Sequence, residues 1–308
     1  MASTLIIVNG AARGGRGMSA AAPHIEALRG LPGGVHVVAT EAPGHAAELA
    51  RQAALDARSA VVAAGGDGTV HEVVNGLLAD GGPGGVQLGI LPVGTGNSFV
   101  RDLGLADPAS AVGALQAGHT VPVDAVRLVH EGGELHFLNL ASFGFSAQAG
   151  ALTNRRYKWL GAGGYVFAVL ECLVGLSAAP LPHACDDGPV DASPCTLVSF
   201  CNSRFTGGDM KMAPDADIAD GQLDVVRIGA MGRRRFLSSF PRIFAGTHPD
   251  MAEVSMGRAR RVRFQVDRPV DAMIDGEVMS IVPHTLEVQP AAIRVFGRAP
   301  AANGGGPT

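Results

Sequence analysis

The sequence predicts two domains, an α/β domain built on a parallel sheet and an antiparallel β-sandwich domain after it. Three observations support this fold class. The chain has 308 residues, more than one ordinary core of roughly 100–200 residues needs. In its first third, β-branched runs alternate with alanine-rich helical stretches, as in a parallel sheet covered on both faces. Beyond about residue 121, the apolar runs shorten, take a period of two and are separated by glycine and proline, which favours a β-sandwich.

The first domain is expected to alternate strictly between strand and helix. The expected strands are the apolar runs 5–8, 35–39, 60–64 and 87–91, and the expected helices cover 20–28, 44–58 and 69–78. In parallel sheets, ligands bind beyond the carboxyl ends of the strands. Two glycine-rich segments follow the third and fourth strands, so we expect the binding site at this edge.

The second domain begins near residue 124, where the pattern changes. Its expected strands include 123–129, 196–201, 223–228 and 262–266, and two apolar helical segments, 157–176 and 234–244, interrupt them. The first helix is too apolar for a surface helix, so we expect it to pack in the core, with the lining of an acyl-chain pocket as the alternative. The predicted domains are therefore residues 1–124 and 125–297. The tail 298–308 is rich in proline, glycine and alanine and is expected to be disordered.

Composition excludes several classes of protein. Hydrophobic residues make up 47% of the chain and charged residues 17%, so the chain can bury a large core. A net charge of −4 and a single tryptophan argue against nucleic acid as a partner. The four cysteines form no CxxC pair, and Glu171 interrupts the most apolar stretch, 159–181. We therefore expect free thiols, no membrane span and a cytosolic protein.

The first glycine-rich segment joins the third strand to the third helix. It reads Gly65-Gly66-Asp67-Gly68-Thr69, and we expect the helix to be capped near Thr69. Glycines let backbone N–H groups approach phosphate oxygens, and the N-terminus of a helix adds positive potential. Asp67 could hold Mg²⁺ or accept a proton. A plain strand–turn–helix with a solvated aspartate explains the same residues.

The second glycine-rich segment follows the fourth strand. It runs Gly94-Thr95-Gly96-Asn97, with Ser98 expected to cap another helix. Neither segment is a Walker A motif, because the lysine is missing, and neither is GxGxxG. The chain therefore has two phosphate-type loops without a known NTPase or dinucleotide signature.

Together, GGDGTVHEVVNGL and LPVGTGNSF resemble the catalytic domain of the diacylglycerol kinase family, shared with sphingosine kinases, ceramide kinases and bacterial lipid kinases. Segment 205–224 and the DGE motif Asp275-Gly276-Glu277 resemble the C-terminal domain of the same family, so the resemblance covers nearly the whole chain. It implies a first domain like those of NAD kinase and phosphofructokinase, with the nucleotide in an interdomain cleft. The chain departs from the family's Asn-Pro start with Asn9-Gly10, and from its Asn-Asp pair with Asn97-Ser98.

The resemblance also implies site residues. The residues it places around ATP are Asn9, Gly65, Gly66, Asp67, Gly68, Thr69, Glu72, Gly94, Thr95, Gly96 and Asn97. It makes Asp275 the first candidate for the general base, with Glu277 in support and Asp67 organising Mg²⁺–ATP. Asp67 itself is the alternative base. Asp217, Asp220 and the carbonyl of Gln222 resemble a structural metal loop, and their oxygen atoms would suit Mg²⁺. An ordinary acidic turn is the alternative.

The implied function is an ATP-dependent lipid kinase that phosphorylates a hydroxyl group of a membrane lipid. Diacylglycerol is the first candidate acceptor, with a sphingoid base, ceramide or phosphatidylglycerol as the others. A kinase for a soluble acceptor and a non-catalytic nucleotide-binding regulator remain alternatives, and a homodimer is left open. The enzyme is expected to contact the inner membrane surface reversibly from the cytosol, through Arg258, Arg260, Arg261 and Arg263, which lie shortly before Asp275. Arg233–Arg235 is the other dense basic cluster of this domain.

Overall fold

The computed structural model describes residues 3–298 apart from 83, 106 and 158–161. The chain forms two compact units, Met1–Val123 with Ala292–Thr308, and Asp124–Ala291. Residues 292–297, which we predicted in the second domain, belong to the first unit. The predicted tail lies outside the described residues from residue 299 onward.

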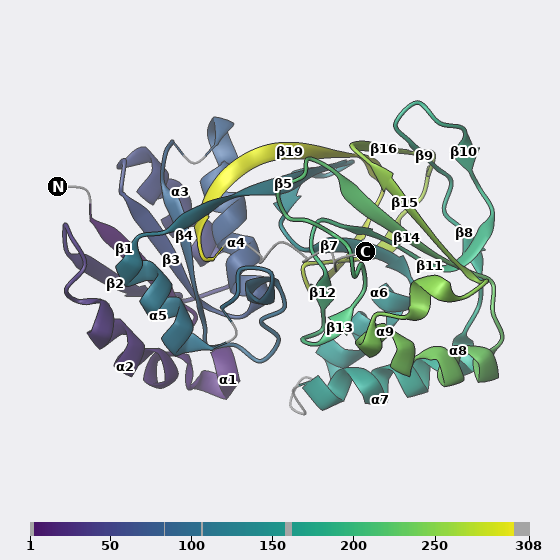
Figure 1. Ribbon diagram of the computed structural model, residues 1–308, viewed down its shortest axis with the longest axis horizontal. Coiled ribbons are helices and arrows are strands. Elements are labelled where there is room, and N and C mark those ends of the chain that lie inside the picture. Colours follow the sequence, from purple (N-terminus) through teal and green to yellow (C-terminus); the bar gives the residue numbers. More distant parts are fainter. Residues whose placement is uncertain (1–2, 83, 106, 158–161, 299–308) are drawn as a thin grey trace, which may run out of the picture. The chain divides into compact units, whose positions relative to one another are not determined.

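The first unit contains a parallel sheet with strand order β4-β3-β1-β2. The strands are β1 (Thr4–Val8), β2 (Val35–Ala39), β3 (Ala60–Gly65) and β4 (Gln87–Pro92). The helices are α1 (Ala12–Gly15), α2 (Gly17–Leu28), α3 (His45–Leu55), α4 (Asp67–Leu78) and α5 (Pro108–Ala117). Every residue of β1 and β3 is buried, so both faces of the sheet are covered. Helix α3 packs on α4, and α2 packs on α5 (Figure 1). This confirms the predicted parallel α/β domain.

A fifth strand joins this sheet from the end of the chain. Strand β19 (Pro283–Phe296) carries the chain back into the first unit, where Val295 pairs with Leu88 of β4 in parallel. The side chains of Ile293 and Val295 are buried.

The prediction of a helix after Asn97 is wrong. The segment forms one 3-10 turn, Phe99–Arg101, and Ser98 makes no side-chain capping bond. Its backbone N–H instead donates to Asp67, and Gly104, at a φ of +68°, ends the turn.

The second unit contains two sheets. One is antiparallel, with strand order β15-β14-β11-β7-β17-β18 and β8 beside β11. Its strands are β7 (Leu140–Gly144), β8 (Ala179–Pro180), β11 (Pro194–Cys201), β14 (Leu223–Gly229), β15 (Val254–Ala259), β17 (Val270–Ile274) and β18 (Glu277–Ile281). The other sheet contains β5 (Thr120–His130), β6 (Gly133–Phe137), β9 (His183–Cys185), β10 (Val190–Asp191), β16 (Arg261–Phe264) and β19. A small hairpin adds β12 (Phe205–Thr206) and β13 (Met210–Lys211).

The core of the second unit lies between these two sheets. Phe143 and Phe200 of one sheet pack on Phe264 of the other, with ring centroids 5.4 and 5.5 Å from the Phe264 ring. Val262 and Ile274 belong to the same buried cluster. Side chains of two sheets that meet in one core define a β-sandwich, so this prediction is also confirmed.

Helices lie outside the sandwich. They are α6 (Phe145–Leu152), α7 (Ala162–Cys172), α8 (Arg233–Ser239) and α9 (Pro241–Ala245), with a π-helical turn at Thr153–Tyr157 and 3-10 turns at Leu173–Gly175 and His248–Asp250. The helix expected over 234–244 is broken after Phe240, because Pro241 has no N–H to continue it.

No helix of the described residues is long and apolar enough to cross a membrane. The four cysteines are free thiols. Complete burial raises the pKa of the Cys201 thiol well above its usual value.

Candidate active site

The predicted phosphate loops meet at the carboxyl edge of the parallel sheet. The register sets Val8 opposite Ala64, and Gly65 opposite Pro92. The N–H of Asn9 then donates to Ala64 at 3.0 Å, and the N–H of Gly94 donates to Gly65 at 2.9 Å. The structure therefore brings together the ends of three strands, as predicted.

Glycine is required where the two loops touch. A Cβ atom on Gly94 would lie 2.3 Å from the Cα of Gly66, and one on Gly65 would lie 2.2 Å from the Thr69 hydroxyl. Real Cβ atoms do not approach other atoms so closely, so side chains here would force the loops apart. The loops pack backbone against backbone, which leaves their N–H groups close to any ligand at this edge.

Asp67 joins the first loop to the second. Its two carboxylate oxygens accept the backbone N–H of Ser98 at 2.9 and 3.1 Å. Asn97 supports the same turn, because its side-chain NH₂ donates to the Gly94 carbonyl at 2.9 Å. The contact to Asp67 uses the backbone of residue 98, so serine in place of the family's aspartate leaves it intact. Thr95 is exposed and Gly96 is half-buried beside them.

Asn9 and Glu72 have different surroundings. The side-chain NH₂ of Asn9 donates to the Thr69 hydroxyl at 3.0 Å, so Asn9 lies among the loops. Glu72 accepts the N–H of Ala46 at 3.2 Å, in the first turn of α3. Glu72 therefore stabilises the start of α3, whose free N–H groups a carboxylate satisfies.

The DGE motif forms the turn of a hairpin between β17 and β18. Asp275 and Gly276 have φ values of +47° and +89°, as a two-residue type I′ turn requires. The Asp275 carboxylate is buried and accepts three backbone N–H groups, from Leu138 at 3.1 Å, Asn139 at 3.0 Å and Leu140 at 3.1 Å. The carboxylate thus holds the start of β7 against the hairpin. Glu277 is exposed.

The predicted metal loop is a pair of acidic turns. Asp217 accepts the N–H of Ala219, and Asp220 accepts the N–H of Gln222, each at 3.0 Å. Arg258 lies 3.5 Å from the other oxygen of Asp220. Each aspartate thus uses one carboxylate oxygen to accept a hydrogen bond within its own turn. The remaining carboxylate oxygens are hard ligands of the kind Mg²⁺ prefers. Within the described residues, no three acidic, histidine or cysteine side chains form a metal-binding group.

Asp124 lies beside this loop and was missed by the sequence analysis. It is only 1% exposed, and its carboxylate accepts N–H groups from Gly221 at 2.6 Å and Ala291 at 2.7 Å. Burial raises the pKa of Asp124, and the charges of Asp220 and Asp217 raise it further. An acidic residue in a predicted buried strand is itself unusual, and that signal could have identified it.

If the loop holds a structural cation, Mg²⁺ should raise the melting temperature of the protein by several degrees over the value in chelator. Asp220→Ala should lower the melting temperature and abolish its dependence on Mg²⁺. Asp215→Ala, which removes an exposed acid of the same segment, should keep that dependence. Identical melting curves of the wild type with Mg²⁺ and with chelator would leave the acidic-turn interpretation, with Arg258 as the balancing charge.

The second unit also contains an apolar cavity with a volume of about 50 Å³. Its walls come from α8, α9, β14, β15 and the segments around them. The lining residues are Phe145, Ser146, Leu197, Met210, Met212, Ile228, Met231, Phe236, Ser239, Phe240, Ile243, His248, Met251 and Val254. None of these described side chains is acidic, lysine or arginine. His248 is buried, its Nε2 lies 3.0 Å from the Met212 carbonyl, and burial lowers its pKa.

The cavity and the DGE hairpin share one packed cluster. Leu140, whose N–H donates to Asp275, belongs to the buried cluster that contains Met210, Met212 and Ile243 from the cavity wall. An apolar wall of this kind suits hydrocarbon groups.

Comparison with known proteins gives two matching family models. Residues 3–128 match the diacylglycerol kinase catalytic domain, and residues 139–297 match the YegS C-terminal NAD kinase beta sandwich-like domain. The chain is 32% identical over 240 residues to a diacylglycerol kinase of Mycobacterium tuberculosis, which covers 77% of this chain and 76% of the relative. It is 30% identical over 283 residues, or 88% of each chain, to a Pseudomonas fluorescens protein named "Probable lipid kinase YegS-like".

A solved structure has the same fold. The crystal structure of a diacylglycerol kinase from Bacillus anthracis matches 96% of this chain and 97% of its own, with a TM-score of 0.71 at 22% identity.

Proposed function

This chain belongs to the diacylglycerol kinase family of lipid kinases, and we propose that it transfers a phosphoryl group from ATP to a hydroxyl of a membrane lipid. Diacylglycerol is the first candidate acceptor, and a sphingoid base, ceramide and phosphatidylglycerol are the others. The enzyme acts from the cytosol and contacts the membrane reversibly.

The glycine loops of the first unit support ATP as the donor. Gly66 and Gly94 leave no side chain where the loops meet, and the first turn of α4 adds N–H groups and positive potential at the same edge. Phosphoryl transfer depends mainly on positioning and on neutralising charge, which Mg²⁺ supplies when it is bound with ATP. Asp67, half-buried between the loops, is the carboxylate we propose to hold that Mg²⁺.

Two carboxylates are candidates for the general base. Asp275 remains the first, because three N–H donors fix its position and a base must be held within reach of the proton it takes. Asp67 is the second. Glu277 is exposed beside Asp275 and would support it through its charge.

The apolar cavity is the observation that carries the choice of a lipid acceptor. Four methionine and three phenylalanine side chains line it: Met210, Met212, Met231, Met251, Phe145, Phe236 and Phe240. Methionine and phenylalanine accommodate flexible hydrocarbon chains of differing shape. A soluble, polar acceptor would gain nothing from such a wall, because its polar groups would lose their contacts with water there.

A variant that fills the cavity tests this role. Ser239→Phe places a ring inside the cavity, so the KM for long-chain diacylglycerol in detergent micelles should rise at least about tenfold while the KM for ATP stays within about twofold. Ser238→Phe is the matched control, since Ser238 is the exposed neighbour on α8, and it should leave both constants unchanged. Melting curves confirm that each variant is folded.

The acceptor is identified by incubating the wild type with labelled ATP and each candidate lipid. If diacylglycerol is phosphorylated and the two serine variants have the same KM for it, the cavity is not part of the acceptor site. Transfer only to a water-soluble alcohol would favour a soluble acceptor. ATP binding without turnover on any acceptor would favour a nucleotide-binding regulator.

A further inference from the structure

Helix α7 exposes apolar side chains where a surface helix carries polar ones. Phe167 is 54% exposed, Leu170 is 45% exposed, and Val174, in the following 3-10 turn, is 73% exposed. Their spacing places them on one stripe. The opposite stripe, with Val169 and Leu173, is buried. The expected packing in the core therefore holds for one face of this helix, while the other face is exposed.

Helices α8 and α9 expose apolar side chains together with arginines. Leu237 and Phe244 are exposed, and so are Arg233, Arg234 and Arg242. In the part of the chain that the structure describes, Arg233 and Arg234 have no acidic partner, while Arg235 forms two hydrogen bonds with Glu253. Unpaired cations beside exposed apolar groups are typical of surfaces that bind anionic membranes.

The inner faces of α7 and α8 pack in one buried cluster. Val169 of α7 and Leu173 of the following 3-10 turn pack in the same buried cluster as Phe236 of α8, and Figure 1 shows α7 and α8 along one side of the second unit. Phe236 and Ile243 also line the apolar cavity. Helices α8 and α9, which expose apolar and basic side chains outward, therefore line the cavity on their inner sides.

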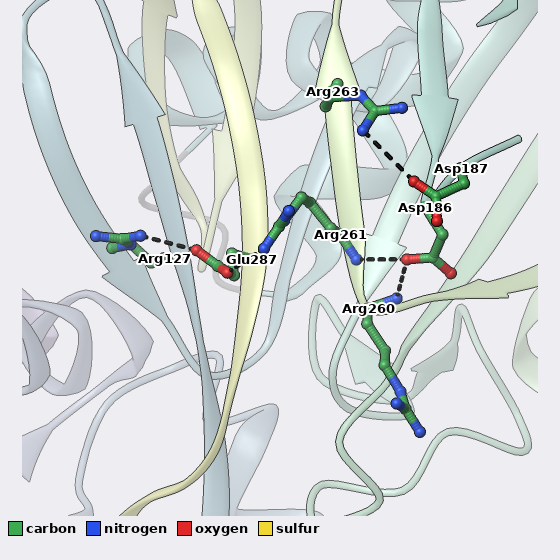
Figure 2. A network of polar contacts seen from close by, with 7 residues as sticks. All are labelled: Arg127, Asp186, Asp187, Arg260, Arg261, Arg263 and Glu287. Carbon is green, nitrogen blue, oxygen red and sulfur yellow. Dashed lines mark hydrogen bonds and ion pairs between the residues drawn. The ribbon is translucent and has the colours of Figure 1, made fainter. Parts of the chain in front are cut away.

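The other arginine cluster differs in its surroundings. Figure 2 shows Arg260 together with Arg261 and Arg263 of β16, and Asp186 accepts the backbone N–H groups of Arg260 and Arg261, each at 2.9 Å. Glu287 pairs with both Arg261 and Arg127, and Asp187 lies 3.9 Å from Arg263. Arg258 faces Asp220 and Asp224, each at 3.5 Å. Because acidic residues lie beside Arg258, Arg261 and Arg263, this cluster offers an anionic surface less net charge.

We propose that the outward faces of α7, α8 and α9 form a docking face for an anionic lipid bilayer. This proposal rests on the proposed lipid kinase function. Phe167, Leu170 and Leu237 enter the boundary between head groups and acyl chains, and Arg233 and Arg234 contact the anionic head groups. The bilayer then meets the outer sides of α8 and α9, whose inner sides line the cavity.

Vesicle sedimentation without ATP tests the docking face. The wild type should sediment with vesicles of phosphatidylcholine and phosphatidylglycerol, much less with phosphatidylcholine alone, and less as salt rises. Arg233→Gln/Arg234→Gln should lower the partition coefficient roughly 30-fold. Arg260→Gln/Arg263→Gln removes the same charge from β16 and should change it less than about twofold. Equal losses in both double variants would overturn the proposal.

The apolar part of the face needs a separate variant. Phe167→Ser/Leu170→Ser replaces two exposed side chains, so its melting temperature should stay close to that of the wild type while vesicle binding falls at least about tenfold. Unchanged binding would overturn the proposal, and so would a wild-type dimer that this variant dissociates, since the face would then bind a second copy of the chain.

Activity separates docking from chemistry. Both docking variants should keep wild-type turnover on detergent-dispersed lipid and lose it on vesicles. A wild type that turns over no lipid in detergent would contradict the proposed function, whereas wild-type turnover of vesicle lipid by both docking variants would contradict the docking face alone.

Discussion

Asparagine in place of Asp275 is expected to reduce kcat on the order of 10²–10⁴-fold while nucleotide affinity stays within a few-fold. The amide keeps the shape of the carboxylate but cannot take the proton of the acceptor hydroxyl. The nucleotide loops belong to the other unit of the chain, which is why ATP binding should survive. Turnover of lipid in detergent and the Kd for ATP are the two measurements.

The structure indicates that the same substitution also lowers stability, and this loss must be separated from the loss of catalysis. The amide NH₂ would point at a backbone N–H, because all three contacts of the carboxylate are N–H donors. Leaving such buried donors unpaired costs about 1–3 kcal/mol, so the melting temperature should fall as well. If Asp275 is the base, the loss of turnover persists at temperatures where the variant is fully folded. Recovery of turnover on cooling would make Asp275 a structural residue and move the base to Asp67.

Alanine at Gly94 is expected to reduce kcat/KM for ATP on the order of 10²-fold. Its Cβ would lie 2.3 Å from the Cα of Gly66, and neither backbone can yield without shifting its loop. The two loops would then separate, and phosphate contacts made by both loops would be lost together. Isothermal titration with ATP and steady-state kinetics measure the effect.

Gly113 provides the matched control for this substitution. It lies in α5, and nothing within 4 Å would meet a Cβ there. Gly113→Ala should leave ATP binding unchanged and stabilise the protein by about 0.5–1 kcal/mol, because alanine favours the helix. Equal ATP affinity in Gly94→Ala and Gly113→Ala would mean that the loops do not hold the nucleotide.

Local patterns made much of the fold predictable. Strands such as Leu5–Val8 and Ala60–Ala64 are uniformly apolar because both faces of a parallel sheet are buried. The break after Phe240 follows from Pro241 and could have been expected from the sequence. The return of residues 292–297 to the first unit could not, because strand pairing between distant segments leaves no local pattern.

Side-chain roles in the candidate site were less predictable. The motifs identified Asp67 and Asp275 as important, yet nothing near them in sequence shows that Ser98 and Leu138 supply their hydrogen-bond donors. The two arginine clusters look alike in sequence, and the fold brings more acidic residues to one of them. Asp186 accepts the backbone N–H of Arg260, 74 residues away, so the sequence alone could not show that this acid lies beside the cluster.

Strand β19 has a consequence for how the protein is made. The first unit receives its last strand from residues that the ribosome synthesises after the whole second unit. Until Ile293 and Val295 arrive, β4 is an open edge of the growing sheet, and such edges invite pairing with other chains. Domains that are continuous in sequence can fold as they emerge. Here the first unit waits until the second unit has been synthesised, so a chain that stops before β19 is complete leaves the first unit unfinished.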